Sequence, residues 1–379
     1  MTESSADAVL FRQVTTQNDR RIGVAQLNAE KSLNALTLPM IRLLDPQLRQ
    51  WARDPAMACV ILHGAGEKAF CAGGDIRNLY RAMKNPSDAP PGNSPRDFFS
   101  EEYRLDHLIH TYPKPIVVWG SGIVMGGGLG LMAGASHRIV TPTSRVAMPE
   151  ITIGLFPDVG ASYFLNRMPQ AFGRFLAFTG ASINANDLRL VGLADHFVAA
   201  ADRQAIVERL TALDWSGNGQ TDRAALTVAL NEFSARAAAE LPESNLARHR
   251  AAIEEMTAGD SLAEVYARIV GYAGDDPWLQ RAARSLAAGS PTTAALIWEL
   301  QRRAPGLSLA DVFRLELIVA LQCCAHPDLA EGVRALLIDK DNQPHWTPPT
   351  LASVTREWIE QHFTAPPWPD GRHPLADLR

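Results

Sequence analysis

The sequence has few cysteines, and none of them is spaced as a metal-binding pair. The four are Cys59, Cys71, Cys323 and Cys324. No two are separated by the two residues found in common zinc and redox motifs, and Cys323 and Cys324 lie in an apolar, helix-like run. We therefore expect buried thiols in a reducing compartment and no metal site.

The chain also lacks a charge surplus and a long apolar run. Its 36 Lys and Arg against 41 Asp and Glu give a net charge of −5, without the basic excess of nucleic-acid-binding proteins. No uninterrupted apolar stretch approaches membrane-spanning length. The first residues, MTESSADAVL, resemble neither a secretory signal nor a mitochondrial transit peptide. These features predict a cytoplasmic protein without nucleic-acid or membrane partners, and they leave homo-oligomer formation open.

Residues 114–160 hold the densest functional signals. The β-branched run Ile116–Trp119 predicts a buried strand, and three glycines follow at Gly126–Gly128. Glycines at a strand-to-helix junction permit positive φ and close approach of another group to the backbone. A helix beginning there directs unpaired N–H groups at the turn, which therefore could bind an anion or an oxyanion.

Two acids follow the glycines in loop-like sequence. Glu150 comes after Pro149, and Asp158 comes after Pro157. Oxyanion donors together with two positioned carboxylates would make a catalytic set. Two alternatives are a plain tight turn and a dinucleotide-binding fingerprint over residues 128–133, although the three-glycine start and Pro149 fit that fingerprint poorly.

A second loop of small residues, GAGEKAFCAGGDI, follows the predicted buried strand Cys59–His63. Ala72, Gly73 and Gly74 in this loop could present another backbone N–H. Two such loops leaving one sheet would form an oxyanion hole, in which one donor typically stabilises a transition state by roughly 3–4 kcal/mol. The alternative for this loop is again a plain turn.

The rest of the chain divides near residue 200. Before it, strands are predicted at Val9–Val14 and Ile22–Leu27, and helical spacing runs from Thr37 to Trp51. After it, few strand-like runs occur. The helices predicted there are Arg203–Leu213, Thr221–Leu241, Leu246–Thr257, Ser261–Gly271, Pro277–Leu286, Pro291–Arg303 and Ser308–Cys323. Two proline-rich segments, 85–97 and Pro366–Arg379, are predicted to be a mobile surface excursion and a frayed end.

Several strings resemble the enoyl-CoA hydratase/isomerase (crotonase) superfamily: EKAFCAGGDI, MGGG and AMPEITIGLFPDVG. FFSEEY, MPEITIGLFPDVGASYFL and EGVRALLIDKD are similar to its 3-hydroxyisobutyryl-CoA hydrolase branch. The likeness covers about residues 10–200 and 307–363. It implies an α/β fold: a crotonase-like spiral of ββα repeats carrying a CoA-thioester site over residues 1–200, followed by a mostly helical region over residues 201–379.

The resemblance also implies site residues. By position, the thioester carbonyl would lie between the N–H groups of Ala72 and Gly127, and Glu150 would match the second glutamate of the hydratases. The first hydratase glutamate corresponds to Gly130 here, while Asp158 stands where hydratases carry a glycine. These departures favour hydrolysis of a short hydroxyacyl-CoA, most simply 3-hydroxyisobutyryl-CoA in valine breakdown, over hydration of a double bond.

Substrate contacts follow from the same resemblance. Glu102 is assigned to the substrate pocket, although taken alone Glu101 and Glu102 read as a solvated acidic pair. The substrate-binding set is completed by Gly73, Gly74 and Asp75. Candidates for the CoA phosphates are Lys31, Lys68 and Arg77, with Arg334 and Lys340 as further possibilities.

Coenzyme A is part of the substrate in this reading, so no separate cofactor is expected. The sequence leaves open the preferred acyl group and whether Glu150 acts as nucleophile or general base. Two rival functions also stay open. One is a hydratase or isomerase of the same fold that uses Glu150 alone, and the other is a non-catalytic acyl-CoA-binding protein.

Overall fold

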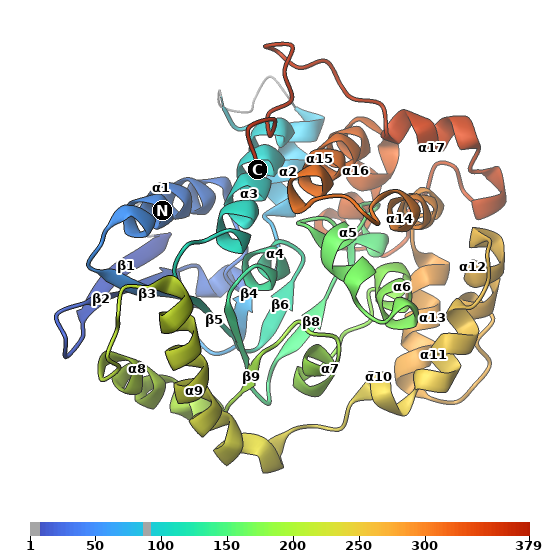
Figure 1. Ribbon diagram of the computed structural model, residues 1–379. Coiled ribbons are helices and arrows are strands. Elements are labelled where there is room, and N and C mark those ends of the chain that lie inside the picture. Colours follow the sequence, from blue (N-terminus) through green and yellow to red (C-terminus); the bar gives the residue numbers. More distant parts are fainter. Residues whose placement is uncertain (1–7, 86–91) are drawn as a thin grey trace. The chain divides into compact units, whose positions relative to one another are not determined.

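The computed structural model describes residues 8–85 and 92–379 (Figure 1). Part of the predicted surface excursion, residues 86–91, lies outside this range. The contacts divide the chain into two compact units. Unit 1 comprises Met1–Gly74, Leu105–Val146 and Ile183–Ala247, and unit 2 comprises Asp75–Arg104, Ala147–Ser182 and Arg248–Arg379. The units interleave along the chain, so they differ from the predicted division at residue 200.

Unit 1 is built on a six-stranded sheet with the order β1-β2-β3-β5-β7-β9. Its first pair is antiparallel, and every later neighbour is parallel. The strands are β1 (Val9–Thr15), β2 (Arg21–Leu27), β3 (Met57–Gly64), β5 (Ile116–Gly120), β7 (His137–Val140) and β9 (His196–Phe197). The strands predicted from the apolar runs near the N-terminus and around residues 60 and 117 are confirmed.

One face of this sheet carries the main core of unit 1. Alternate residues of β2, β3 and β5 contribute to it, as the two-residue period of a strand requires. The helices α8 (Arg203–Thr211) and α9 (Gly219–Ala237) supply apolar side chains to the same cluster. Its members include Trp119 and Trp215, and strand residues such as Ile61 and Val117 pair in register within it.

Helix α1 (Leu38–Arg53) forms where it was predicted because its start carries local helix signals. Thr37 caps it by accepting a hydrogen bond from the Met40 N–H at 3.3 Å, and proline occupies the first turn. Trp51 packs against β2 so closely that a Cβ on Gly23 would lie 2.8 Å from its ring. Only glycine fits at that position.

A second, three-stranded sheet has the order β4-β6-β8. Its strands are β4 (Ala69–Cys71), β6 (Ile123–Met125) and β8 (Arg145–Ala147). Along the chain a long strand, a short strand and a helix recur: β3-β4-α2 (Ile76–Lys84), β5-β6-α4 (Gly127–Ala133), and β7-β8 with a 3-10 turn at Glu150–Thr152. These ββα repeats and the helical region that follows confirm the predicted fold class.

Unit 2 is mostly helical. Residues up to Arg104 of α3 (Pro95–His110) belong to it. Its other helices are α2, α5 (Ala161–Phe164), α6 (Gln170–Thr179), α11 (Arg250–Thr257), α12 (Leu262–Val270), α13 (Pro277–Ala288), α14 (Pro291–Arg303), α15 (Leu309–Ala325), α16 (Pro327–Val333) and α17 (Arg356–His362), with a π-helical turn at Arg334–Ile338. The short helix α7 (Ala185–Leu190) follows α6 in the sequence but belongs to unit 1, and α10 (Asn245–Arg248) follows α9 at the boundary between the two units.

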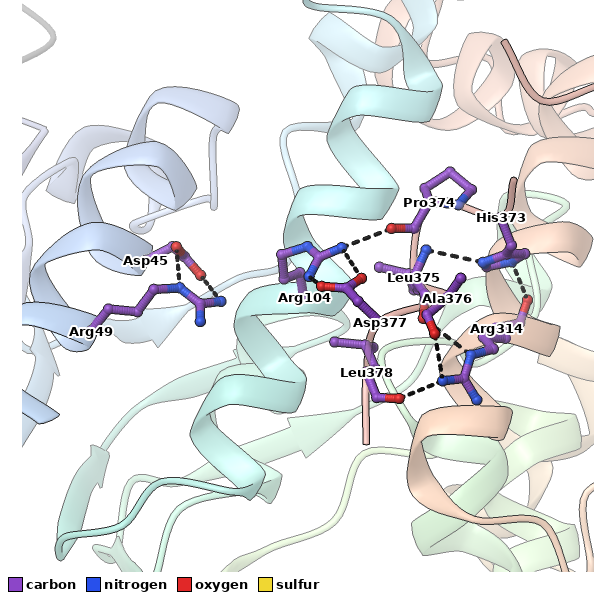
Figure 2. A network of polar contacts seen from close by, with 10 residues as sticks. All are labelled: Asp45, Arg49, Arg104, Arg314, His373, Pro374, Leu375, Ala376, Asp377 and Leu378. Carbon is purple, nitrogen blue, oxygen red and sulfur yellow. Dashed lines mark hydrogen bonds and ion pairs between the residues drawn. The ribbon is translucent and has the colours of Figure 1, made fainter. Parts of the chain in front are cut away.

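The C-terminal segment is anchored, which corrects the prediction of a frayed end. Arg104 of α3 donates hydrogen bonds to both carboxylate oxygens of Asp377, at 2.7 and 2.8 Å, and to the Pro374 carbonyl (Figure 2). Arg314 of α15 donates to the carbonyls of Leu375 and Leu378. The Leu375 side chain is fully buried. Proline content therefore gave the wrong expectation because these contacts come from helices far away in the sequence.

Candidate active site

The two glycine loops lie side by side in unit 1. Strand β4 pairs in parallel with β6, so the loops leave the same edge of the small sheet. A Cβ on Gly73 would lie 3.4 Å from the Met125 carbonyl oxygen, and one on Gly128 only 2.3 Å from the carbonyl oxygen of Cys71. The expected pairing of two small-residue loops is therefore present, and it is tight enough to require glycine at position 128.

The second loop turns directly into helix α4. Gly126 adopts a φ of 45°, and its carbonyl accepts the N–H groups of Leu129 and Gly130. Gly127 is the first residue of the helix, where a backbone N–H has no partner in the preceding turn. The amide of Gly127 therefore lies at the start of the helix, and its role as an oxyanion donor stays a prediction.

The first loop corrects one prediction. The N–H of Ala72 donates to the Leu33 carbonyl at 3.0 Å, so this amide is already occupied. Gly73 has a φ of 107°, and its carbonyl accepts the Leu36 N–H at 2.7 Å. The N–H groups of Gly73 and Gly74 have no acceptor within the described residues. A donor from this loop must therefore come from one of these glycines rather than from Ala72.

Three carboxyl groups gather in unit 2. Glu102 is on α3, Glu150 opens the 3-10 turn after β8, and Asp158 follows Pro157. Their exposed fractions are 2%, 5% and 4%. One oxygen each of Glu102 and Glu150 is buried without a hydrogen-bond partner. The alternative of a solvated acidic pair is therefore wrong for Glu102.

Asp158 is held by a tyrosine of helix α3. The hydroxyl of Tyr103 donates to the Asp158 carboxylate at 2.6 Å, and both side chains are buried. The Tyr103 ring also packs on Phe99 and Phe313, with centroids 5.8 and 5.7 Å apart. This packing fixes the direction in which the hydroxyl points.

The carboxyl groups titrate far from their usual range. Burial raises the pKa of Glu102, and the charges of Asp158 and Glu150 raise it further. Burial and the charge of Asp158 likewise raise the pKa of Glu150 well above its usual value. For Asp158, burial raises the pKa to about 6, against the opposing effect of the Tyr103 hydrogen bond. One ionised and one protonated carboxyl group can therefore coexist near neutral pH.

The turn after Asp158 is supported by a residue that the sequence analysis missed. Val159 has a φ of 51°, a left-handed conformation that costs a β-branched residue roughly 1–3 kcal/mol. The next residue, Gly160, has a φ of 87°. Glu316 of α15 accepts the N–H groups of Gly160 and Ser162 at 2.7 and 2.8 Å. Its only sequence signal is a single acid within the apolar stretch 312–320.

Of the other predicted substrate contacts, Asp75 is hydrogen-bonded within the protein and the three basic residues are exposed. Asp75 caps helix α2, where its carboxylate accepts hydrogen bonds from the backbone and side-chain nitrogens of Asn78, so its role in binding stays a prediction. Lys31, Lys68 and Arg77 are exposed. None of these three forms an ion pair among residues 8–85 and 92–379, and their contact with CoA phosphates stays a prediction.

Arg334 is not available for a phosphate in this conformation. It forms ion pairs with Glu331, Asp339 and Asp341 at 2.6 to 2.8 Å. These hydrogen bonds raise its pKa further above the usual arginine value. The suggestion that Arg334 binds CoA therefore has no support, whereas Lys340 stays a candidate.

The described part of the chain contains no group of three or more His, Cys, Asp and Glu side chains arranged to hold a metal ion. None of the four cysteines forms a disulfide within the described residues, and the thiols of Cys59, Cys71 and Cys323 are buried, as predicted. Over the same residues, no helix combines the length and apolar character that crossing a bilayer requires.

Comparison with known proteins now identifies the family. Residues 22–363 match the family model described as enoyl-CoA hydratase/isomerase. The chain belongs to the enoyl-CoA hydratase/isomerase family. The crotonase resemblance is confirmed. The family match also covers residues 201–306, where the quoted sequence motifs did not extend.

Several curated relatives share one name. The zebrafish (Danio rerio) protein named "3-hydroxyisobutyryl-CoA hydrolase, mitochondrial" is 39% identical over 366 residues, which cover 96% of this chain and 91% of that protein. The human protein of the same name is 35% identical and covers 90% and 86%. This finding contradicts the prediction of a cytoplasmic protein, because these enoyl-CoA hydratase/isomerase family members are mitochondrial. The predicted location is therefore corrected.

Solved structures show the same fold. One described as a carnitinyl-CoA dehydratase from Mycobacterium thermoresistibile superposes with a TM-score of 0.81 at 35% identity, covering 94% of this chain and 96% of that one. Another, described as an enoyl-CoA hydratase from Rhodobacter sphaeroides 2.4.1, gives 0.79 at 34% identity, with 94% and 97% covered. Family members with nearly the whole fold in common thus carry different reaction names, so the choice of reaction depends on individual residues.

Proposed function

We propose that this chain hydrolyses 3-hydroxyisobutyryl-CoA to 3-hydroxyisobutyrate and free coenzyme A. The observation that carries the proposal is the buried group of three carboxyl side chains, Glu102, Glu150 and Asp158, whose pKa values are raised to different extents. Thioester hydrolysis needs one carboxylate to act on the carbonyl or on water, and an acid to protonate the departing thiolate. The name shared by the curated relatives supports the same reaction.

Two routes for Glu150 balance chemically. In the first, its carboxylate attacks the thioester carbon and expels the CoA thiolate, and water then hydrolyses the resulting anhydride to release the acid and restore the carboxylate. In the second, Glu150 takes a proton from water while the oxygen of that water attacks the same carbon. Both routes require Glu150 in its ionised form, which its raised pKa disfavours, so its proton must pass to a neighbouring group before the reaction. The departing thiolate then gains a proton from a neighbouring protonated carboxyl group.

Asp158 and Glu102 have distinct parts in this proposal. Asp158, held by the Tyr103 hydroxyl, binds the hydroxyl of the acyl group, positions water or shares proton transfer to the thiolate. Glu102 has a buried oxygen without a partner in the described structure, as does Glu150. An unpaired buried oxygen is costly, so a hydroxyacyl group that donates a hydrogen bond to Glu102 would be favoured.

The oxyanion is the other charge that must be stabilised. We assign this role to the amide of Gly127 and to one glycine amide of the first loop, Gly73 or Gly74, in place of Ala72. The two loops approach each other closely, because a Cβ on Gly73 would lie 3.4 Å from the Met125 carbonyl oxygen. Preformed backbone donors do not reorganise as the negative charge develops, which makes them effective in such a role.

The main alternative is a hydratase or isomerase, the class named for the solved structures. Gly130 argues against a hydratase, because the hydratase pattern places a glutamate at this position and glycine has no carboxyl side chain. A single shuttle base would also leave the buried Asp158 and its tyrosine partner without a role. A non-catalytic acyl-CoA-binding protein would likewise give no reason to bury three carboxyl groups together.

The test is thiol release from a panel of acyl-CoA esters that includes 3-hydroxyisobutyryl-CoA and crotonyl-CoA. We expect release from the hydroxyacyl ester and neither release nor hydration with crotonyl-CoA. Glu150→Gln should lower kcat by about 10²-fold or more while the ester still binds. Hydration of crotonyl-CoA without thiol release would establish the alternative, and tight binding without turnover, unchanged by Glu150→Gln, would establish a binding protein.

A further inference from the structure

The turn that carries Asp158 does not hold its shape by local contacts alone. Its one internal backbone bond runs from the Ala161 N–H to the Asp158 carbonyl at 2.8 Å. Val159 and Gly160 both have positive φ, and Val159 is a residue type that avoids that region. Such a conformation persists only when the surrounding structure enforces it.

Glu316 is the group that enforces it. The carboxylate reaches from α15, more than 150 positions away in the sequence, and uses one oxygen for the Gly160 N–H and the other for the Ser162 N–H. Its side chain is fully buried. From the same helix, the ring of Phe313 lies 3.1 Å from the position of a Cβ on Gly160 and packs on Tyr103. Helix α15 therefore contacts both supports of Asp158: the turn and the tyrosine.

The need to cap the start of helix α5 does not by itself explain why a buried glutamate, Glu316, is found here. Helix α5, which starts after Gly160, has only four residues. Helix starts are usually capped by a local Ser, Thr, Asp or Asn, as Thr37 caps α1. Here a distant carboxyl group is fully buried instead, which is costly unless it is well bonded. The bonds fix two amides within four residues of Asp158.

We propose that Glu316 is a positioning residue for Asp158: it holds the turn 158–162 so that the Asp158 carboxylate stays at the Tyr103 hydroxyl and beside Glu150. The inference rests on the proposed function. The glutamate acts through the turn and touches no substrate. Its removal should therefore affect turnover more than substrate binding.

The first experiment compares Glu316→Gln with a matched control, Asp222→Asn. Asp222 is also buried and also accepts two backbone N–H groups, those of Ser216 and Gly217 at 2.8 and 3.1 Å, but it lies in unit 1. We expect Glu316→Gln to lower kcat for 3-hydroxyisobutyryl-CoA by about 10- to 100-fold with a smaller change in KM, because small misplacements of catalytic groups are costly. Asp222→Asn should keep the wild-type kcat even where Tm falls equally.

Two further variants separate positioning from folding. Val159→Gly removes the residue that resists the left-handed φ, so the double variant with Glu316→Gln should recover part of the lost kcat. Glu316→Asp keeps the carboxyl group but shortens the side chain, and its kcat should lie between those of wild type and Glu316→Gln. A kcat of Glu316→Gln within about twofold of wild type would overturn the inference, as would an equal loss in Asp222→Asn.

Amide hydrogen exchange provides a readout that does not depend on the reaction. In Glu316→Gln the amides of Gly160 and Ser162 should exchange faster than in wild type, while those of Ser216 and Gly217 stay protected. Unchanged exchange at residues 160 and 162 would refute the inference even if activity fell. If the wild-type protein releases no thiol, the proposed function is wrong, and the exchange data still decide whether Glu316 holds the turn.

Discussion

Replacing Tyr103 with phenylalanine removes one hydroxyl and keeps the ring that packs on Phe99 and Phe313. The hydroxyl donates to the Asp158 carboxylate at 2.6 Å in a buried setting, and this hydrogen bond lowers the pKa of Asp158 against the effect of burial. Without the donor, the ionised carboxylate loses its only side-chain hydrogen bond in the described structure, so the pKa of Asp158 must rise.

The size of the shift follows from the type of bond. A hydrogen bond to a charged group contributes about 1.5–3 kcal/mol. One pKa unit corresponds to about 1.4 kcal/mol, so the first ionisation of the carboxyl group should move upward by about 1–2 units. The pKa of Asp158 stands at about 6 with the hydroxyl in place, so Tyr103→Phe shifts it to neutral pH or above.

The assay is the pH dependence of kcat/KM for 3-hydroxyisobutyryl-CoA, with free CoA measured after quenching. The acidic limb reports ionisations of the free enzyme, and we expect it to move upward by about 1–2 pH units in Tyr103→Phe. Tyr112→Phe is the control, because the Tyr112 hydroxyl is also buried but donates to the neutral Leu48 carbonyl at 2.7 Å. An acidic limb that stays in place, or moves equally in the control, would refute the reasoning.

Three other predictions concern stability. Gly128→Ala places a Cβ 2.3 Å from the Cys71 carbonyl oxygen, a backbone atom with little freedom to move, so thermal denaturation should show a loss of about 1–3 kcal/mol. Leu375→Ala empties a fully buried site, and urea denaturation should show a loss of about 2–5 kcal/mol, whereas a frayed tail would give almost none. The pKa of Asp158 is raised from 3.8 to about 6, so the stability it contributes is full below pH 3.8 and is lost as pH rises through 6. Over that window the unfolding free energy should fall by up to about 1.4 kcal/mol per pH unit more in wild type than in Asp158→Asn.

Much of the fold was predictable because its signals are local. The helices α13 and α14 each begin with proline after a capping residue, Asp276 and Ser290, and both were predicted at their observed starts. The short, mostly apolar run Cys59–His63 predicted the buried strand β3. These patterns record backbone preferences and burial within one element, and neither depends on the rest of the chain.

The site was predictable only in part because its finer features depend on distant residues. Glycine content identified the two loops, but the choice between Ala72 and its neighbours depends on the Leu33 carbonyl, which occupies the Ala72 amide. The sequence identified Asp158, yet the roles of Tyr103 and Glu316 depend on which helices pack beside it. A tyrosine in an apolar helix gives the same signal whether its hydroxyl is solvated or bound to a carboxylate.

The anchored C-terminal segment has a consequence for biosynthesis. Arg104, next to Tyr103, and Arg314, two positions before Glu316, both donate to residues 374–378. These residues are translated after both helices, so a growing chain on the ribosome has α3 and α15 without the segment that joins them. Unit 2 therefore completes this part of its packing only once residues 374–378 have emerged, and a substitution that displaces them would leave both arginines without these acceptors.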